Sequence, residues 1–244
     1  MKPYPFYLVS TPIGNLEDLS ARAAETLRTV DCVLAEDTRK ARVLLDHLGI
    51  RVQVRSYHDH NQERMTPLII REIKEGMRFA LVADAGTPLI SDPGYLLVRR
   101  LAAEGIPFTA IPGACAVTTA LALSGLPPDR FTFYGYVPRK KGERDGLLRE
   151  AAQNPYTSIF YESPHRLLAT LEACAEILGE REIVVARELT KLHEEVSRGA
   201  AAELLARFTA TAPRGELTLL VRGLGRRRGA RGRPEDDDGA DRSD

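Results

Sequence analysis

The sequence predicts an α/β protein made of two domains, and three observations support this fold class. Short apolar runs of strand length alternate with longer segments of helical periodicity. In the first half the apolar runs lack polar alternation, as is typical of parallel strands that helices cover on both faces. The chain has 244 residues, of which 43% are hydrophobic and 28% charged, enough to bury the cores of two soluble domains.

Five strand–helix pairs account for the first half of the chain. Each begins with an apolar run and continues into a segment whose apolar residues have helical spacing. The predicted strands are residues 6–9, 32–35, 52–57, 78–83 and 107–111. The predicted helices are residues 19–30, 38–49, 62–76, 95–105 and 114–125. Ligands of such sheets bind beyond the carboxyl ends of the strands, so the loops after these strands are predicted to carry the site.

The second half contains more strands per helix, and this rhythm predicts a mixed sheet. The expected strands are residues 131–137, 157–163, 182–188, 194–199 and 216–223. A charged helical stretch follows the first of them, a helix is expected at residues 166–179, and a short helix precedes the last strand. The second domain is therefore also α/β.

The domain boundary is expected near residues 113–128, where the pattern changes around a proline-rich turn. We predict an N-terminal α/β domain of residues 1–118 and a C-terminal α/β domain of residues 119–222. Residues 223–244 are mostly Gly, Arg and Asp with few apolar side chains, and this composition predicts a disordered tail.

Charge and cysteine content limit the possible functions. The formal net charge is zero, with 34 basic and 34 acidic residues, so any surface for nucleic acid has to be a local patch. The three cysteines lack the spacing of a zinc site or a disulfide framework, which fits a reducing cytosol and predicts no metal. No apolar run is long enough to cross a bilayer. We expect a cytoplasmic protein without a membrane partner.

The most informative loop is LVADAGTPLISDPG, residues 81–94. One glycine or proline is ordinary turn punctuation, but here Gly86, Pro88, Pro93 and Gly94 follow an apolar strand within a few residues. They hold the backbone open around small polar groups, which are Asp84, Thr87, Ser91 and Asp92. This pattern predicts a pocket wall.

Other loops leave more than one interpretation open. STPIGN supplies a single glycine, Gly14, where a Rossmann protein has three, so a dinucleotide site, with Glu36 on a ribose, is weakly supported. In AEDTR, Asp37 or Thr38 equally suits a helix cap. His58 and His60 in SYHDHN lack further ligands at supporting spacing, which favours a polar loop facing the substrate over a metal site.

These segments, together with IPGACAV, FYGYVPRKKGER, FYESPHR, ARELTKLHEE and GELTLLV, resemble the tetrapyrrole methylases. Members of that family bind S-adenosylmethionine in a cleft between two α/β domains, without a Rossmann-type glycine loop. DAGTP and PGACA match the broad family, whereas STPIGNL, AEDTR and ESPHR together match its branch that acts on ribosomal RNA. The resemblance covers nearly the whole chain except the tail.

The resemblance implies an activity and its partners. We expect methyl transfer from S-adenosylmethionine to the ribose 2′-hydroxyl of a cytidine in the 16S rRNA of the small ribosomal subunit, by a homodimer. One alternative is the same fold acting on a tetrapyrrole of the precorrin type. The other is a ribosome-binding factor that keeps the pocket without turnover.

The resemblance also implies which residues bind the cofactor. They are Asp84, Gly86, Thr87, Pro88, Ile90, Cys115, Ala116, Tyr161, Ala186 and Leu217. Many family members have Asp where Thr87 stands, so Asp84 or backbone groups are expected to take over its polar role. The small residues of PGACA suit a close backbone approach to a ligand.

A ribose hydroxyl is a poor nucleophile, and a general base would speed its attack by roughly 10²–10⁴-fold. The candidates are Asp37, His58, Asp59 and Glu162, with Asp37 first because it follows a strand and neighbours Arg39. Basic runs are solvated helix faces when taken singly, but become phosphate contacts where they face one cleft. The candidate RNA contacts are Arg39, Lys40, Arg139, Lys140, Lys141, His165 and Arg166.

Overall fold

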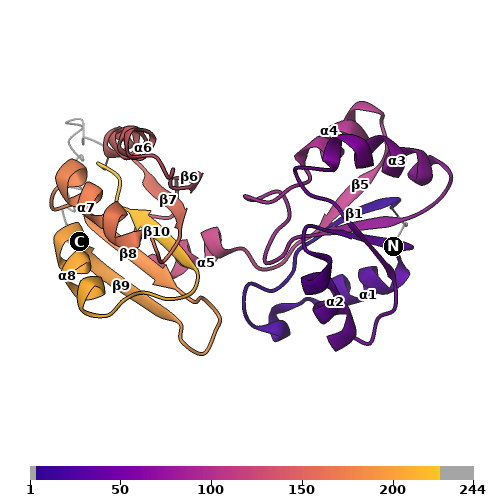
Figure 1. The fold of residues 1–244 in the computed structure, drawn as a ribbon, viewed down its shortest axis with the longest axis horizontal. Coiled ribbons are helices and arrows are strands. Elements are labelled where there is room, and N and C mark those ends of the chain that lie inside the picture. The colour runs from indigo at the N-terminus through magenta and orange to yellow at the C-terminus, as the bar shows by residue number, and fades with distance from the viewer. Residues whose placement is uncertain (1–3, 226–244) are drawn as a thin grey trace, which may run out of the picture.

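The computed structural model describes residues 4–225, which form two α/β units side by side (Figure 1). The first unit contains β1 (Phe6–Val9), α1 (Ala21–Thr29), β2 (Cys32–Ala35), α2 (Thr38–His47), β3 (Gln53–Ser56), α3 (Gln62–Lys74), β4 (Phe79–Val82), α4 (Tyr95–Ala103) and β5 (Phe108–Ile111). A 3₁₀ turn, η1 (Leu16–Asp18), precedes α1. The predicted helix at 19–30 begins only at Ala21, because the Ser20 side chain accepts a hydrogen bond from the Ala23 amide and caps the helix.

The first sheet has the strand order β3-β2-β4-β1-β5, and all its pairs are parallel. Helices cover both of its faces, α1 and α2 on one side and α3 and α4 on the other (Figure 1). In β4, Ala80 and Val82 pack with α1 and α2, while Phe79 and Leu81 pack with α3 and α4. Both faces are buried, which explains why the strands read as continuous apolar runs.

The second unit contains β6 (Phe131–Tyr136), α6 (Lys141–Gln153), β7 (Thr157–Glu162), α7 (Leu167–Leu178), β8 (Glu182–Arg187), β9 (Glu195–Ala200), α8 (Ala201–Ala210) and β10 (Leu217–Val221). The strand order is β6-β7-β10-β8-β9, with β6 parallel to β7 and the other pairs antiparallel. The predicted α/β fold, with a parallel first sheet and a mixed second sheet, is confirmed.

Helix α5 (Ala116–Ser124) leads from the first unit into the second. Its residues Val117, Ala120 and Leu121 pack against Ile159 and Leu220 on one face of the second sheet, while α6, α7 and α8 cover the other. The predicted division at residue 118 falls inside this helix, and it stays a prediction.

Two further sequence predictions concern the membrane and the tail. None of the helices within residues 4–225 is long and apolar enough to cross a membrane. Of the predicted tail, residues 226–244 lie outside the described residues.

Candidate functional site

A cavity of about 530 Å³ lies where the loops at the carboxyl ends of the first sheet meet the second unit. The first unit contributes residues from the loops after β1, β2, β4 and β5 and from the first turns of α2 and α5, namely Ile13, Glu36, Lys40, Asp84, Ala85, Gly86, Thr87, Ile90, Ser91, Asp92, Cys115 and Ala116. The second contributes Tyr136, Tyr161, Glu162, Ser163, Pro164, Ala186, Leu189, Gly215, Glu216, Leu217 and Thr218. Its volume is in the usual range for small-molecule pockets.

The loop after β4 is tied to both neighbouring loops. Thr11 and Gly86 exchange backbone hydrogen bonds of 2.9 and 3.1 Å. The Thr87 hydroxyl donates to the Ala114 carbonyl at 3.0 Å and lies 3.2 Å from the Ser10 hydroxyl. Gly86 has a φ of 84°, and a Cβ there would lie 3.1 Å from Ile13, so the loop requires glycine. Thr87 therefore holds the cavity wall together.

The same loop continues through a strained backbone. Leu89 and Ser91 have φ values of 74° and 66°, and Gly94 has 128° at the start of α4. Left-handed conformations of non-glycine residues cost energy and gather at functional sites. This conformation presents Asp92 to the cavity.

Two carboxylates of the first unit have contrasting environments. Asp84 accepts a hydrogen bond from the Asp37 amide at 3.1 Å and pairs with the Lys40 ammonium at 2.9 Å. Asp92 makes no hydrogen bond or ion pair with the described residues. Burial raises the pKa of Asp92 to about 7, and the nearby charges of Glu36 and Asp84 add to the shift. Burial and Asp84 also raise the pKa of Glu36.

The second unit supplies the apolar and aromatic wall. Tyr161, on β7, contacts the rings of Phe133 and Tyr136 edge to face at 4.9 and 5.4 Å. Burial raises the pKa of Tyr161 above its usual value, so its phenol stays neutral. Ala186 and Leu217 are buried beside it. This end of the cavity suits a flat, apolar ligand group.

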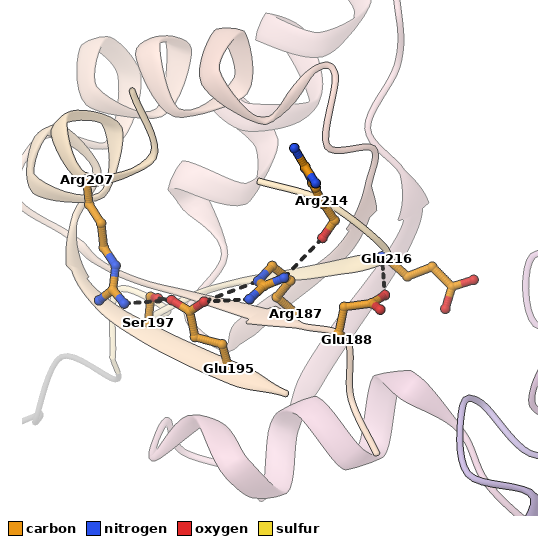
Figure 2. Close-up of polar contacts among 7 residues, drawn as sticks. All are labelled: Arg187, Glu188, Glu195, Ser197, Arg207, Arg214 and Glu216. Atoms are coloured by element: carbon orange, nitrogen blue, oxygen red, sulfur yellow. Dashed lines mark hydrogen bonds and ion pairs between the residues drawn. The ribbon is translucent and has the colours of Figure 1, made fainter. Parts of the chain in front are cut away.

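A short loop before β10 closes this wall. Figure 2 shows Arg187 between the Glu195 carboxylate, at 2.9 Å, and the Arg214 carbonyl, at 3.4 Å. Glu188 accepts a hydrogen bond from the Glu216 amide at 2.9 Å. Glu195 is itself held by Ser197 and Arg207. The network fixes the loop that brings residues 215–218 to the cavity.

The ten predicted cofactor residues lie at the cavity or directly beside it. Nine of them line the cavity, and Pro88 is buried beside it. The Thr87 hydroxyl is bonded to other loops, and Asp84 is paired with Lys40. The assignment of these residues to a cofactor stays a prediction.

The candidate bases lie in different places. Glu162 reaches the cavity, but it is only 3% exposed and is bonded to Thr170 at 2.5 Å and to Arg166 at 2.8 Å. Asp37 and His58 line a neighbouring hollow of about 450 Å³ that shares Glu36 with the cavity.

In that hollow, Asp37 caps α2, as one sequence interpretation predicted, by accepting a hydrogen bond from the Arg39 amide. The Arg39 guanidinium also bonds both carboxylate oxygens, and these contacts hold the pKa of Asp37 well below its usual range. The His58 Nδ1 atom is buried and has no hydrogen-bond partner among residues 4–225. Within the same range, no three His, Cys, Asp or Glu side chains are placed to hold a metal ion.

Of the candidate RNA contacts, two line the cavity or the adjoining hollow, and the others lie on the second unit. Lys40 lines the cavity and Arg39 the adjoining hollow. Arg139, Lys140 and Lys141 lie at the start of α6, where Lys140 pairs with Glu143. His165 precedes α7, and Arg166 donates to the Val137 carbonyl as well as to Glu162. Their contact with RNA stays a prediction.

Sequence reasoning missed several cavity residues, namely Tyr136, Leu189, Glu216 and Thr218. Asp92 lines the cavity, as its place in the predicted pocket wall implied, but the sequence did not indicate that its carboxylate would lack a partner. Tyr136 and Glu216 had no sequence signal, because their positions depend on how the second sheet packs against the first unit.

The sequence matches one family model and several curated relatives over most of its length. Residues 5–205 match the family model described as Tetrapyrrole (Corrin/Porphyrin) Methylases. The chain is 48% identical over 219 residues to "Ribosomal RNA small subunit methyltransferase I" of Halalkalibacterium halodurans, covering 90% of this chain and 76% of the relative. It is 45% identical to the protein of the same name from Thermotoga maritima, covering 88% and 97%.

Among solved structures, uroporphyrin-III-C-methyltransferase from Thermus thermophilus superimposes with a TM-score of 0.62 at 22% identity. The match covers 89% of this chain and 93% of that structure. At this level of identity the likeness concerns the fold, and it agrees with the two-sheet architecture described above.

Proposed function

The chain belongs to the tetrapyrrole (corrin/porphyrin) methylases, and we propose that it is an S-adenosylmethionine-dependent methyltransferase acting on ribosomal RNA of the small subunit. The observation that carries the proposal is a cavity between the two units, built in a chain that is nearly half identical to relatives named for this activity. The finer proposal is that the acceptor is the ribose 2′-hydroxyl of a cytidine in 16S rRNA, and that the enzyme works in the cytoplasm as a homodimer.

The residues around the cavity fit S-adenosylmethionine. The apolar end formed by Tyr161, Ala186 and Leu217 suits an adenine ring, which is flat and weakly polar. The loop after β4 adds the carboxylate of Asp84, which suits the cationic methionine part of the molecule. Gly86 keeps this wall thin enough for a ligand to approach the backbone.

When bound, S-adenosylmethionine supplies a methyl carbon already activated by a sulfonium sulfur. The protein's own task is to align the acceptor hydroxyl behind that carbon and to exclude water. The loops joined through Thr11, Gly86 and Thr87 form a rigid wall for this alignment. The apolar residues of the second unit keep water from the opposite side.

A transfer assay on small ribosomal subunits tests the proposal. Wild-type protein, unmodified subunits and radiolabelled S-adenosylmethionine should yield labelled 16S rRNA, and mass spectrometry of the digested RNA should identify a 2′-O-methylcytidine. Gly86→Val, whose side chain would collide with Ile13, should lose both transfer and S-adenosylhomocysteine binding in calorimetry while keeping a native circular dichroism spectrum.

Each result has a distinct meaning for the proposal. A methyl group on a base would overturn only the 2′-hydroxyl assignment. Transfer to a uroporphyrinogen but not to RNA would overturn the RNA substrate. Binding of S-adenosylhomocysteine without transfer to subunits would favour a non-catalytic ribosome-binding factor.

A further inference from the structure

The carboxylates that line the cavity differ in whether they have partners. Three are neutralised by a cation: Asp84 by Lys40, Glu162 by Arg166 and Glu216 by Lys191. The other two, Glu36 and Asp92, form no hydrogen bond or ion pair with any residue in the described part of the chain. A carboxylate already bound to a cation is a weak proton acceptor. Only the two unpaired groups are free to take a proton.

Asp92 is the better placed of the two. Glu36 is exposed and also borders the neighbouring hollow, whereas Asp92 is partly buried and lies on the strained segment between Leu89 and Gly94. The charged and titratable groups that face Asp92 are Glu36, Lys40, Asp84, Tyr136 and Tyr161. The two carboxylates and burial outweigh Lys40, and the resulting pKa of about 7 is suited to a general base near neutral pH.

An exposed aromatic ring lines the same cavity as this carboxylate. Tyr136 lines the cavity, is 59% exposed and is supported edge-on by Tyr161. A Cβ on Gly135 would lie 3.8 Å from the Ser91 hydroxyl oxygen, so this end of β6 adjoins the residue before Asp92. Exposed aromatic rings are stacking surfaces for unpaired RNA bases. A base stacked on Tyr136 would lie in the same cavity as Asp92.

We propose that Asp92 accepts the proton of the attacking ribose hydroxyl and that Tyr136 positions the nucleotide by stacking on its base. The inference rests on the proposed methyl transfer to RNA. In the step, the O–H bond breaks and its proton passes to an Asp92 carboxylate oxygen. The ribose oxygen forms a bond to the methyl carbon, and the C–S bond breaks with its electron pair left on sulfur, giving S-adenosylhomocysteine.

Single-turnover kinetics on small subunits tests the role of Asp92. Asp92→Asn should slow transfer at saturating substrate by about 10²-fold or more and abolish the rise in rate with pH near 7. Its affinity for S-adenosylhomocysteine, measured by calorimetry, should stay within about threefold of wild type. Glu36→Gln is the matched comparison, because it removes the other unpaired carboxylate, and it should cost less than tenfold.

The role of Tyr136 is tested by the separation of KM from kcat. Tyr136→Ala should raise the KM for subunits about tenfold or more with a smaller effect on kcat, and Tyr136→Phe, which keeps the ring, should restore the wild-type KM.

The outcomes separate this inference from the proposed function. If the wild type does not methylate subunits, the function fails and this inference fails with it. If the wild type is active but Asp92→Asn keeps its rate or its pH profile, only the assignment of Asp92 is overturned. Loss of S-adenosylhomocysteine affinity at an unchanged rate would make Asp92 a cofactor ligand instead. An unchanged KM in Tyr136→Ala would overturn the stacking contact.

Discussion

The ionisation of Asp92 makes the stability of the folded protein depend on pH. Its pKa rises from 3.8 to about 7 on folding, so between these values the folded chain binds more protons than the unfolded chain. Ionisation of Asp92 therefore lowers stability progressively as pH rises through this window, and the loss is complete above pH 7. Below pH 3.8 both states are protonated and Asp92 has no effect.

Asp92→Asn is accordingly expected to melt at a higher temperature than wild type at pH 8 and at the same temperature near pH 4. Because Asp92 is partly exposed, solvent screens its charge, and we expect a gain of about 1 kcal/mol, or roughly 2–4 °C. Differential scanning calorimetry at the two pH values measures it. Equal melting temperatures at pH 8 would show that the carboxylate ionises without penalty in the folded protein.

For individual residues, the sequence revealed only those features of the site that depend on neighbours along the chain. Asp37 as a helix cap and the DAGTP loop as a pocket wall follow from neighbouring residues along the chain. Whether a carboxylate has a partner depends on long-range packing. Asp84 pairs with Lys40 because β2 lies beside β4, whereas Asp92 forms no ion pair within residues 4–225. Such differences decide the chemistry and have no sequence signature.

The loop between α8 and β10 shows how one element shapes the cavity. Gly215 has a φ of 84°, and a Cβ there would lie 2.1 Å from the Glu188 carboxylate. This carboxylate accepts the hydrogen bond from the Glu216 amide. Gly215→Ala should displace Glu188 and move the loop, costing about 1–3 kcal/mol of stability and weakening S-adenosylhomocysteine binding about tenfold. Thermal melts and calorimetry measure the two effects.

Gly146→Ala is the matched control for this variant. Gly146 lies on the exposed side of α6, where an added Cβ meets nothing within 4 Å. The substitution should stabilise the protein by about 0.5–1 kcal/mol, because alanine favours helix more than glycine does, and should leave binding unchanged. Normal binding in Gly215→Ala would show that the cavity tolerates movement of this loop.

Secondary structure was largely predictable at this scale, since most strands of both sheets are apolar runs, the polar exceptions being β3 and β9. The order of the strands was not. The sequence predicted a parallel first sheet and a mixed second one, but it held no information that β10 would lie between β7 and β8. The contribution of residues 215–218 to the cavity follows from that order, so Glu216 and Thr218 were missed.

At the scale of the whole molecule, the two units share one site and touch beside it. A Cβ on Gly14 would lie 2.5 Å from Lys191, and the Asn15 amide donates to the Thr190 hydroxyl at 3.1 Å. Because the cavity has walls from both units, a ligand that fills it stabilises both together. The close approach of Gly14 and Asn15 to residues 190 and 191 fixes the first unit against the second beside the cavity.

S-adenosylhomocysteine at 100 times its Kd should therefore stabilise the protein by about 2.7 kcal/mol. Hydrogen exchange should slow both in residues 84–92 and in residues 215–218. Gly86→Val, which is expected not to bind, should show neither change in the presence of the ligand. Slower exchange confined to the first unit would mean that the second unit does not contribute to the site.

The central place of β10 also affects how the protein is made. Strands β7 and β8 both pair with β10, yet residues 217–221 are translated after every other described strand. The first unit can fold while synthesis continues, but until β10 emerges from the ribosome β7 and β8 expose unpaired edges to neighbouring chains. A nascent chain that stalls before residue 217 is thus left with an incomplete sheet and no closed pocket, a species for chaperones or proteases to remove.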